Sequence, residues 1–552
     1  MNKSMVGILD LPNEILLMIL KKLDNFDVLY SLVGVNKKLD NLACNINFTR
    51  TVDLMKVPSN RKDDWTTCVL LDRVFMRILP QIHDDVECLT VDGCFWQRVL
   101  LAGNYLNLHK ITLVNLDLNL AYQIFHKKSL FIHVFKYQIS DLVIMISDKI
   151  SNQSEQDLLF NIYSNIFISF TNLNYLDLDL DNSYPFRRLL LDSLSSTTCS
   201  SSSIAHLRIK MHNFDDCLRL LDGRLSQLHT LIIYLDCIYD AFNGILHRTL
   251  QIPYDSLKII NNSDTLLKLK CFSLYVYFAT DQFVSKVVPL LHQMLHLEKL
   301  TLSLRIRDRN TFIDGNYLHK YIVSQMSHLH TFIFDIVTEN VMGNQLLRPS
   351  VDDIRRTFIE KGHCVDCYID YHYNSIGRCH VYSLPFNMER IHKITHKFPG
   401  GMFMNVRVLC VFDYDRPFEH DYFVKISHSF PLLCHLRIIN KIPQNDKWPR
   451  QLMKPEEAFL IIEYMHLVQL SCIGAHVDYV EQFLCNLNTR LPCLSELHVN
   501  YEHLVTVTEN FTRNATRMNC SKLEHITFPR KTGIVRSKNF YLYFPLLYHE
   551  EM

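Results

Sequence analysis

A short pattern of apolar residues recurs along most of the chain and limits what it can fold into. The pattern is apolar-x-x-apolar-x-apolar, which places alternate side chains on one face of a β-strand. Successive copies mostly begin about 25–35 residues apart, a spacing typical of repeat proteins that contribute one strand per repeat. Clear copies begin at Leu108, Leu173, Leu228, Leu297, Leu329, Leu433, Leu494 and Leu523, and weaker ones at Val86, Ile139, Ile204, Leu269, Val406 and Leu467.

The segments between the strand motifs have helical apolar spacing. Examples are "DDCLRLLDGRL" (215–225), "FVSKVVPLLHQML" (283–295) and "HVDYVEQFLCNLN" (476–488). A strand and a returning helix in each repeat predict an α/β solenoid, with a curved parallel sheet inside and helices outside. These motifs resemble leucine-rich repeats. The asparagine that such repeats place after each strand is mostly missing, and only Asn115, Asn213 and Asn440 come near it. We therefore expect irregular repeats whose turns are closed in another way.

The longest irregular interval runs from Leu329 to Val406. Within it, residues 352–384 have the pattern of a helix, a strand, a turn at Asn374–Gly377 and a second strand. We interpret this interval as one degenerate repeat with an inserted hairpin at about 364–384.

The stretch "LPNEILLMILKKL" (11–23) predicts a helix with Pro12 in its first turn. Ile15, Leu16, Ile19, Leu20 and Leu23 form one apolar stripe, while Leu17 and Met18 lie off it on a second apolar face. We expect one face to pack on neighbouring helices through Ile15, Ile19 and Leu23, and the other to await a separate chain. Asp27 is the expected N-cap of a second apolar helix, "VLYSLVGV" (28–35), and "NKKLDNLA" (36–43) forms a third.

These residues resemble an F-box, with Asn36 and Leu39 standing where the family commonly has Cys and Trp. The resemblance implies docking on a Skp-type adaptor of a cullin–RING ubiquitin ligase. The alternative is an N-terminal helical cap for the repeats, because solenoids need capping elements. The adaptor-binding residues implied by the resemblance are Leu11, Pro12, Ile15, Leu16, Ile19, Leu20, Leu23, Leu29, Leu32 and Val35.

Charge and composition exclude several function classes. Lys plus Arg and Asp plus Glu each number 57, so the net charge implies no general attraction to nucleic acid or to an anionic membrane. Neither GxGxxG nor GxxxxGK[ST] occurs, which argues against the usual nucleotide sites. The chain has no signal peptide pattern and no apolar run of membrane-spanning length, so we expect a soluble protein of the cytoplasm or nucleus.

A zinc site is the main alternative chemistry that the sequence offers. Cys364 and Cys367 form a CxxC, and His392 and His396 follow. The interval between the two pairs is too long for a compact zinc finger, and residues three apart in a strand point to opposite faces. We therefore expect reduced structural cysteines, no metal, no cofactor and no catalytic residues; an enzyme using the 364–396 insertion with a metal is the least favoured reading.

Polar residues at the x positions of the strands are the candidate substrate-binding residues, because horseshoe repeats usually bind proteins on the sheet face. Their charge changes sign along the sheet, which suggests a protein or peptide ligand of mixed charge; for the acidic stretch 176–182 a solvated strand face is the alternative reading. They are Asp177, Asp179, Arg208, Lys210, Thr301, Arg437 and His498.

Together these features predict a substrate receptor of an SCF-type (Skp–cullin–F-box) ubiquitin ligase. We expect an F-box at 1–50, a helical linker at 51–85, a leucine-rich-repeat-like array at 86–530 and a tail at 531–552. The array would hold the target near the ligase, with no catalytic group of its own. The second hypothesis is an interaction scaffold built on the same repeats without a ligase role.

Overall fold

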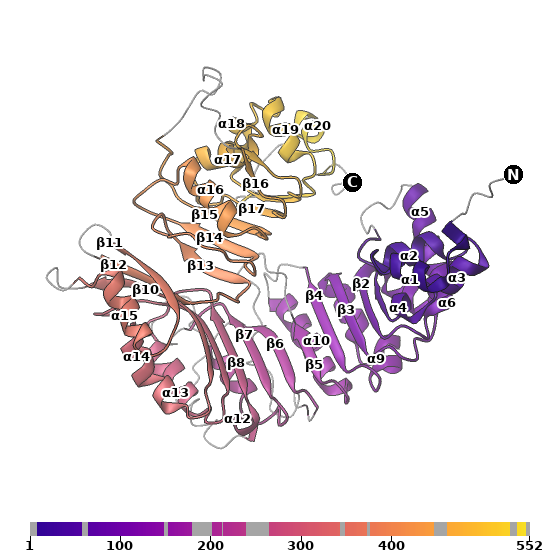
Figure 1. The fold of residues 1–552 in the computed structure, drawn as a ribbon, viewed down its shortest axis with the longest axis horizontal. Coiled ribbons are helices and arrows are strands. Elements are labelled where there is room, and N and C mark those ends of the chain that lie inside the picture. The colour runs from indigo at the N-terminus through magenta and orange to yellow at the C-terminus, as the bar shows by residue number, and fades with distance from the viewer. Residues whose placement is uncertain are drawn as a thin grey trace. The chain divides into compact units, whose positions relative to one another are not determined.

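A computed structural model describes most of the chain, and it divides into two compact units (Figure 1). The first unit comprises Met1–Phe278, Val284–Leu300 and Gln325–Thr331, and the second comprises Ala279–Phe283, Thr301–Ser324 and Phe332–Met552. The residues described are 8–57, 65–147, 153–178, 201, 203–211, 214–238, 264–342, 348–371, 376–445, 461–529 and 538–547.

The first unit begins with short helices, each started by a polar side chain or by proline. Pro12 precedes the first α-helix, Asp24 accepts a hydrogen bond from the Phe26 amide at 2.9 Å, and Asn36 accepts one from the Leu39 amide at 3.0 Å. The N-cap predicted at Asp27 is wrong, because Asp24 caps the second helix three residues earlier. The elements are η1 (Ile8–Asp10), α1 (Asn13–Leu20), α2 (Asn25–Leu32), α3 (Lys37–Ala43) and α4 (Ile46–Thr49).

A parallel sheet follows, in which each strand pairs with the next along the chain. At the start of each strand after the first, two consecutive amides donate to one carbonyl of the preceding segment, as His109 and Lys110 do to Glu87 at 3.0 and 3.1 Å. The strands are β1 (Thr51–Asp53), β2 (Cys88–Asp92), β3 (Lys110–Leu116), β4 (Asp141–Ile146), β5 (Tyr175–Leu178), β6 (His206–Met211), β7 (Thr230–Leu235) and β8 (Cys271–Val276).

Helices lie along the connections of this sheet (Figure 1). The side chains that alternate along each strand are buried, and the leading leucines Leu108, Leu173 and Leu228 are fully enclosed. The connecting helices are α5 (Trp65–Asp72), the π-helix η2 (Arg73–Ile78), α6 (Leu79–Ile82), η3 (Gly93–Phe95), α7 (Trp96–Ala102), α8 (Leu118–Phe125), α9 (Leu130–Phe135), α10 (Gln153–Ser169), α11 (Phe214–Leu220), α12 (Asp264–Lys268) and α13 (Val288–His292).

Two strands, one π-helix and the 3-10 turn η7 (Val323–Gln325) have residues in both units. The strands are β9 (Lys299–Ile306) and β10 (Thr331–Met342), and the π-helix is η6 (Phe283–Val287).

The second unit contains an antiparallel hairpin and a second parallel sheet. β11 (Val365–Tyr371) and β12 (Ile376–Ser383) pair antiparallel, and β12 also pairs with β10. The parallel sheet has the strand order β13-β14-β15-β17-β19-β20, and β16 pairs with β18. Its strands are β13 (Arg390–Ile394), β14 (Val408–Phe412), β15 (His435–Ile439), β16 (Ile462–Glu463), β17 (Gln469–Ser471), β18 (Thr489–Arg490), β19 (Glu496–His498) and β20 (His525–Thr527).

The helices of the second unit include one close approach that requires glycine. A Cβ on Gly315, at the start of α14, would lie 2.3 Å from the carbonyl oxygen of Thr357 in α15. These helices are α14 (Gly315–Tyr321), α15 (Val351–Ile359), α16 (His420–Ser429), α17 (Val477–Leu484), α18 (Tyr501–Val507), α19 (Asn514–Cys520) and α20 (Lys538–Tyr543).

The strand motifs read from the sequence are confirmed at every position, because a strand begins two residues after each of the fourteen motif starts. The helix–strand–strand pattern of 352–384 is also confirmed. Strands β1, β13, β16 and β18 were missed. In β13 a register shift between Ile391 and Ile394 breaks the apolar alternation, and β1 lies within the segment 51–85 that was predicted to be a helical linker. The body is thus a mixed α/β structure with large parallel sheets.

Carboxylates close some of the turns that lack the expected asparagine. Asp92 accepts a hydrogen bond from the Cys94 amide at 3.0 Å, and Asp413 accepts from the amides of Asp415 and Arg416 at 2.9 and 3.1 Å. Asn115 donates to Asp92 at 2.8 Å, whereas Asn213 lies outside the described residues. In the part of the chain that the structure describes, no helix has both the length and the apolar character needed to cross a membrane.

Candidate functional site

The outer face of the first helices is a patch of exposed apolar side chains. Met18 is 66% exposed, Leu23 54%, Ile19 46% and Ile15 43%, while Leu16 is only 4% exposed. The expectation that Ile15, Ile19 and Leu23 pack inward is therefore wrong. Helix α1 has only two turns, and Leu16, with the half-buried Leu20 one turn later, occupies the inner side. We call Ile15, Met18, Ile19 and Leu23 the α1 patch.

The residues that the F-box resemblance implied for adaptor binding divide by burial. Leu16 and Leu29 are buried, so in this structure they hold the helices together and offer no surface to a partner. Met18, the most exposed apolar residue of α1, was not among them, although its position off the apolar stripe was the available signal. Half-buried are Leu11, Leu20 and Leu32, and exposed are Pro12, Ile15, Ile19, Leu23 and Val35.

Two basic side chains hold this region in place. Lys38 on α3 donates to the carbonyls of Leu9 and Leu11 at 2.6 and 2.9 Å, which fixes the turn before α1. Arg73 on η2 donates to the carbonyls of Tyr30 and Val33 at 2.8 and 2.7 Å. Because the last carbonyls of a helix have no intrahelical donor, Arg73 supplies donors at the end of α2.

On the sheet of the first unit, Asp177 and Arg208 face each other in adjacent strands. Their closest atoms are 3.8 Å apart, and the Arg208 guanidinium lies 5.2 Å from the centre of the Tyr234 ring. Tyr234 stacks on Tyr275 with ring centres 4.6 Å apart. Arg208 and Lys210 are half-buried and Asp177 is buried, whereas Asp179 lies outside the described residues.

In the second unit, Thr301 and His498 are buried and Arg437 is half-buried. Arg437, Ser471 and His498 are in lateral register on β15, β17 and β19. His498 contacts Gln469 at 3.1 Å, and Gln469 also donates to Glu496 at 2.8 Å. Thr301 is too enclosed to contact a ligand directly, since it is only 4% exposed.

A buried polar network in the second unit was not foreseen from the sequence. His380 bonds Asp335 at 2.5 Å and Tyr368 at 2.8 Å, and the Asp335 and His380 side chains are completely buried. Burial acts to raise the pKa of Asp335, but the charge and hydrogen bond of His380 outweigh it and lower that pKa. The His392 amide also donates to Asp335, at 3.2 Å.

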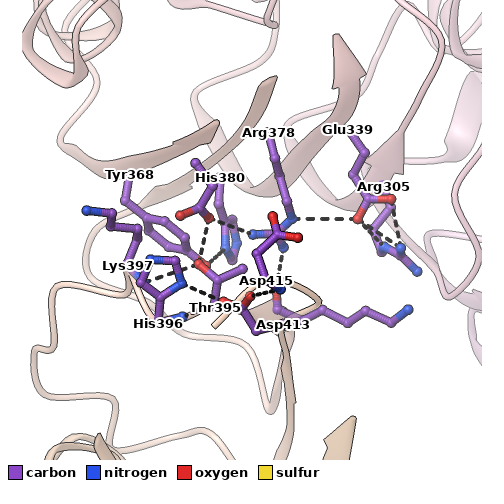
Figure 2. Close-up of polar contacts among 12 residues, drawn as sticks. Arg305, Glu339, Tyr368, Arg378, His380, Thr395, His396, Lys397, Asp413 and Asp415 are labelled. Carbon is purple, nitrogen blue, oxygen red and sulfur yellow. Dashed lines mark hydrogen bonds and ion pairs between the residues drawn. The ribbon is translucent and has the colours of Figure 1, made fainter. Parts of the chain in front are cut away.

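Arginines and carboxylates continue this network along the strands (Figure 2). Arg305 donates to both Glu339 oxygens at 2.8 Å. Arg378 lies 3.7 Å from Glu339 and 3.6 Å from Asp370, and it donates to the carbonyl of Lys393. Burial acts to raise the pKa of Glu339, but the positive charges of Arg305 and then Arg378 lower it.

The residues weighed as a zinc site do not form one cluster. Cys367 is buried, and its thiol donates to the Val351 carbonyl at 3.5 Å, whereas Cys364 is exposed. Burial raises the pKa of the Cys367 thiol to about 11. His396 bonds Asp413 at 2.5 Å. No group of three potential metal ligands occurs within the residues that the structure describes.

Comparison with known proteins identifies the N-terminal helices. Residues 8–51 match the F-box domain, and this range contains the α1 patch. A search of curated proteins finds no match for the chain. An F-box domain indicates binding to a Skp-type adaptor within a cullin–RING ligase, and F-box proteins are generally substrate adaptors and not catalysts.

Proposed function

From the F-box domain at residues 8–51, we propose that this chain is the substrate-recognition subunit of an SCF-type ubiquitin ligase. The observation that carries the proposal is the α1 patch, an exposed apolar surface within the F-box match. Side chains of this kind remain in water only at a free-energy cost, so a partner that covers them gains affinity.

The rest of the chain would bind the target protein. The repeated hydrogen-bond pattern at the strand starts, present in both units, supports an irregular leucine-rich-repeat-like solenoid. Within it we propose the sheet-face residues Arg208, Lys210 and Arg437 as target contacts, with Asp177 and His498 beside them. Thr301 is buried, so we propose that it supports the neighbouring contact residues without touching the target. We also propose Asp179, which lies outside the described residues, as a target contact.

The chain would contribute to ubiquitin transfer by proximity. Holding the target on the same assembly as the conjugating enzyme raises the effective concentration of a target lysine. No catalytic side chain of this protein is needed for that effect. We propose that no cofactor or metal takes part, and that the protein works in the cytoplasm or nucleus.

The scaffold hypothesis has one observation in its favour. Helices α2 and α4 contact β1, the first strand, so the N-terminal helices do cover the end of the sheet. This capping role does not account for the α1 patch, because a cap needs to be apolar only on the side facing the sheet. The ligase role accounts for the α1 patch as well as for the side of the helices that faces the sheet.

Reconstitution separates the two hypotheses. The intact chain is mixed with a purified Skp-type adaptor and a cullin–RING subunit, and the mixture is analysed by size-exclusion chromatography with light scattering. The ligase role predicts one complex that contains all three components. If the chain always elutes apart from the adaptor, the ligase role is wrong and the scaffold hypothesis replaces it.

A further inference from the structure

Helix α9 of the first unit exposes apolar side chains on its outer side (Figure 1). Its inner side is formed by Phe131, Ile132 and Phe135, which are almost fully buried. The helical turn continues beyond α9, because the Ile139 amide donates to the Phe135 carbonyl at 3.0 Å. Residues three, four and seven positions apart therefore share one side. The exposed apolar side chains on that side are Leu130 (60% exposed), Val134 (40%) and Tyr137 (63%).

This outer side differs from that of a helix that faces water. Helix α16, for example, exposes Asp421, Lys425 and His428, which is the charged pattern expected of a solvated helix. On α9 only His133 interrupts the apolar row. Apolar side chains gathered in this way gain free energy when an apolar medium covers them.

Lysines flank the apolar row at both ends. Lys127 and Lys128 are exposed and directly precede Ser129, the N-cap of α9. Lys136 follows the helix, and its ammonium lies 4.6 Å from the centre of the Tyr137 ring. Within the described residues, the ammonium groups of Lys127 and Lys128 form no ion pair or hydrogen bond. Both charges can therefore meet an external anion.

Few carboxylates oppose these lysines along the chain. Between residues 93 and 140 there are five Lys or Arg and a single acidic residue, Asp117. Asp117 caps the far end of α8, where it accepts a hydrogen bond from the Leu120 amide at 2.7 Å. The eight residues of α8 span about 12 Å, which exceeds the Debye length of about 8 Å at physiological ionic strength.

The helix packed beside α9 adds little negative charge. Glu155 and Asp157 lie near the N-terminus of α10, whereas Phe170, just after its C-terminus, contacts Phe131 of α9 with ring centres 5.9 Å apart. Residues 158–170 are uncharged. The acidic end of α10 is thus about 18 Å away from the end that meets α9.

The carboxylates at the neighbouring strand starts are already engaged. Glu87 pairs with Arg50 at 2.6 Å, while Asp141 accepts from the Ser140 hydroxyl at 2.5 Å and lies beside Lys110 in register. The chain as a whole has no net charge, so the positive charge around α9 is a local concentration.

We propose that Lys127, Lys128, Leu130, Val134 and Tyr137, which we call the α9 face, bind the surface of an anionic lipid bilayer. The three apolar side chains would enter the boundary between head groups and acyl chains, and the lysines would contact the lipid anions. Tyrosine suits this depth, because its ring is apolar and its hydroxyl can stay in water.

The shape of the α9 face favours a bilayer over a protein partner. Its three apolar side chains project from one short helix, and a bilayer accepts such side chains without shape complementarity. A stable protein interface needs about 800 Å² on each partner, packed as closely as a protein interior. The proposal does not depend on the ligase role, since α9 lies outside the F-box match.

Flotation of the intact chain with lipid vesicles tests the proposal. The vesicles contain phosphatidylcholine alone or with about 30% phosphatidylserine, in about 0.1 M or about 0.5 M NaCl. We expect binding to the phosphatidylserine vesicles in low salt, and at least about tenfold weaker binding to phosphatidylcholine alone or in high salt. Absence of binding, or equal binding to both vesicles, would overturn the proposal.

Two double variants locate the contact. Lys127→Gln with Lys128→Gln should weaken binding to the phosphatidylserine vesicles about 20-fold, because each lysine near an anionic surface contributes about fivefold. Leu130→Gln with Tyr137→Gln should weaken it about tenfold or more. The side chains are exposed, so both variants should keep the thermal unfolding midpoint of the parent protein. If either folded variant binds as the parent does, the proposal is wrong.

Matched controls make the same changes elsewhere on the first unit. Lys268→Gln with Lys299→Gln removes two exposed lysines, and Leu267→Gln with Leu295→Gln removes two leucines that are 57% and 56% exposed. Both controls should bind within about twofold of the parent protein. Losses as large as those of the α9 variants would show that binding is not located at the α9 face.

A blocked soluble peptide of alternating glutamate and leucine tests the other occupant, an acidic protein segment. Binding of this peptide by the parent protein and not by the α9 variants, without binding to vesicles, would overturn the membrane assignment. Adaptor binding should be unchanged in the α9 variants, so failure of this proposal and failure of the ligase role give different results.

Discussion

Replacing Met18 and Ile19 with alanine removes much of the α1 patch and leaves the buried Leu16 untouched. Complete burial of such a side chain is worth about 1.5–3 kcal/mol. Met18 is 66% exposed and Ile19 46%, so covering the exposed fractions would contribute about 1–2 and about 0.7–1.4 kcal/mol. The double variant should therefore lose about 2–3 kcal/mol of adaptor binding, which raises Kd about 30-fold to 150-fold.

Calorimetric titration with a purified Skp-type adaptor measures this loss. The matched control is Leu101→Ala on α7, a leucine that is 88% exposed and lies outside the F-box match. All proteins should have similar thermal unfolding midpoints, because exposed side chains contribute little to stability. The reasoning is refuted if the folded double variant binds within about threefold of the parent protein, or if Leu101→Ala loses as much affinity.

Three further predictions concern stability. Arg73→Ala should lower the free energy of unfolding by about 2 kcal/mol in urea denaturation, because two charge-assisted hydrogen bonds at the end of α2 are lost. The control Arg77→Ala, at an exposed arginine, should change it little. Equal effects of the two variants would contradict the role of Arg73 in holding α2. Gly315→Ala should lower the thermal unfolding midpoint, because the new Cβ would lie 2.3 Å from the Thr357 carbonyl oxygen. Relieving such overpacking costs about 1–3 kcal/mol. An unchanged midpoint would contradict this prediction and show that α14 can shift away from α15. Burial lowers the pKa of His392 to about 4 in the folded protein. Between about pH 6.5 and 4, His392 is therefore protonated in the unfolded chain but neutral in the folded one. As the pH falls through this range, the free energy of unfolding should decrease by about 3 kcal/mol because of this residue. His392→Phe should remove that part of the pH dependence measured by urea denaturation, and an unchanged slope would refute it.

Much of the strand layout could be read from the sequence because most strands begin two residues after an apolar residue, usually leucine, that is buried. Leu108, Leu173, Leu228 and Leu297 each precede a strand by two residues and are completely enclosed. The pattern is local, so it needs no knowledge of distant contacts. Strand β13 was not predicted, because its register shift breaks the apolar alternation from which the strands were identified.

The orientation of α1 could not be read in the same way. Six consecutive apolar residues, Ile15 to Leu20, make every face of the helix apolar, so periodicity does not say which side faces inward. Packing of Leu16 against the neighbouring helices decides it, and that is a tertiary property.

The buried arginine–carboxylate network of the second unit was missed for a different reason. Arg305, Glu339, Arg378 and Lys393 are far apart in the sequence and belong to no motif, and only strand pairing brings them together. Charged residues at strand positions next to buried apolar ones were the one available signal, as in "SLRI" (303–306) and "IGRCHV" (376–381). Register across the hairpin is needed to use that signal.

Hydrogen–deuterium exchange of the intact chain, with and without a Skp-type adaptor, tests the central claim most directly. The account predicts slower amide exchange in residues 13–23 on adaptor binding, and unchanged exchange in strands β2 to β8. Binding with no protection in residues 13–23, or with protection confined to the sheet, would contradict it.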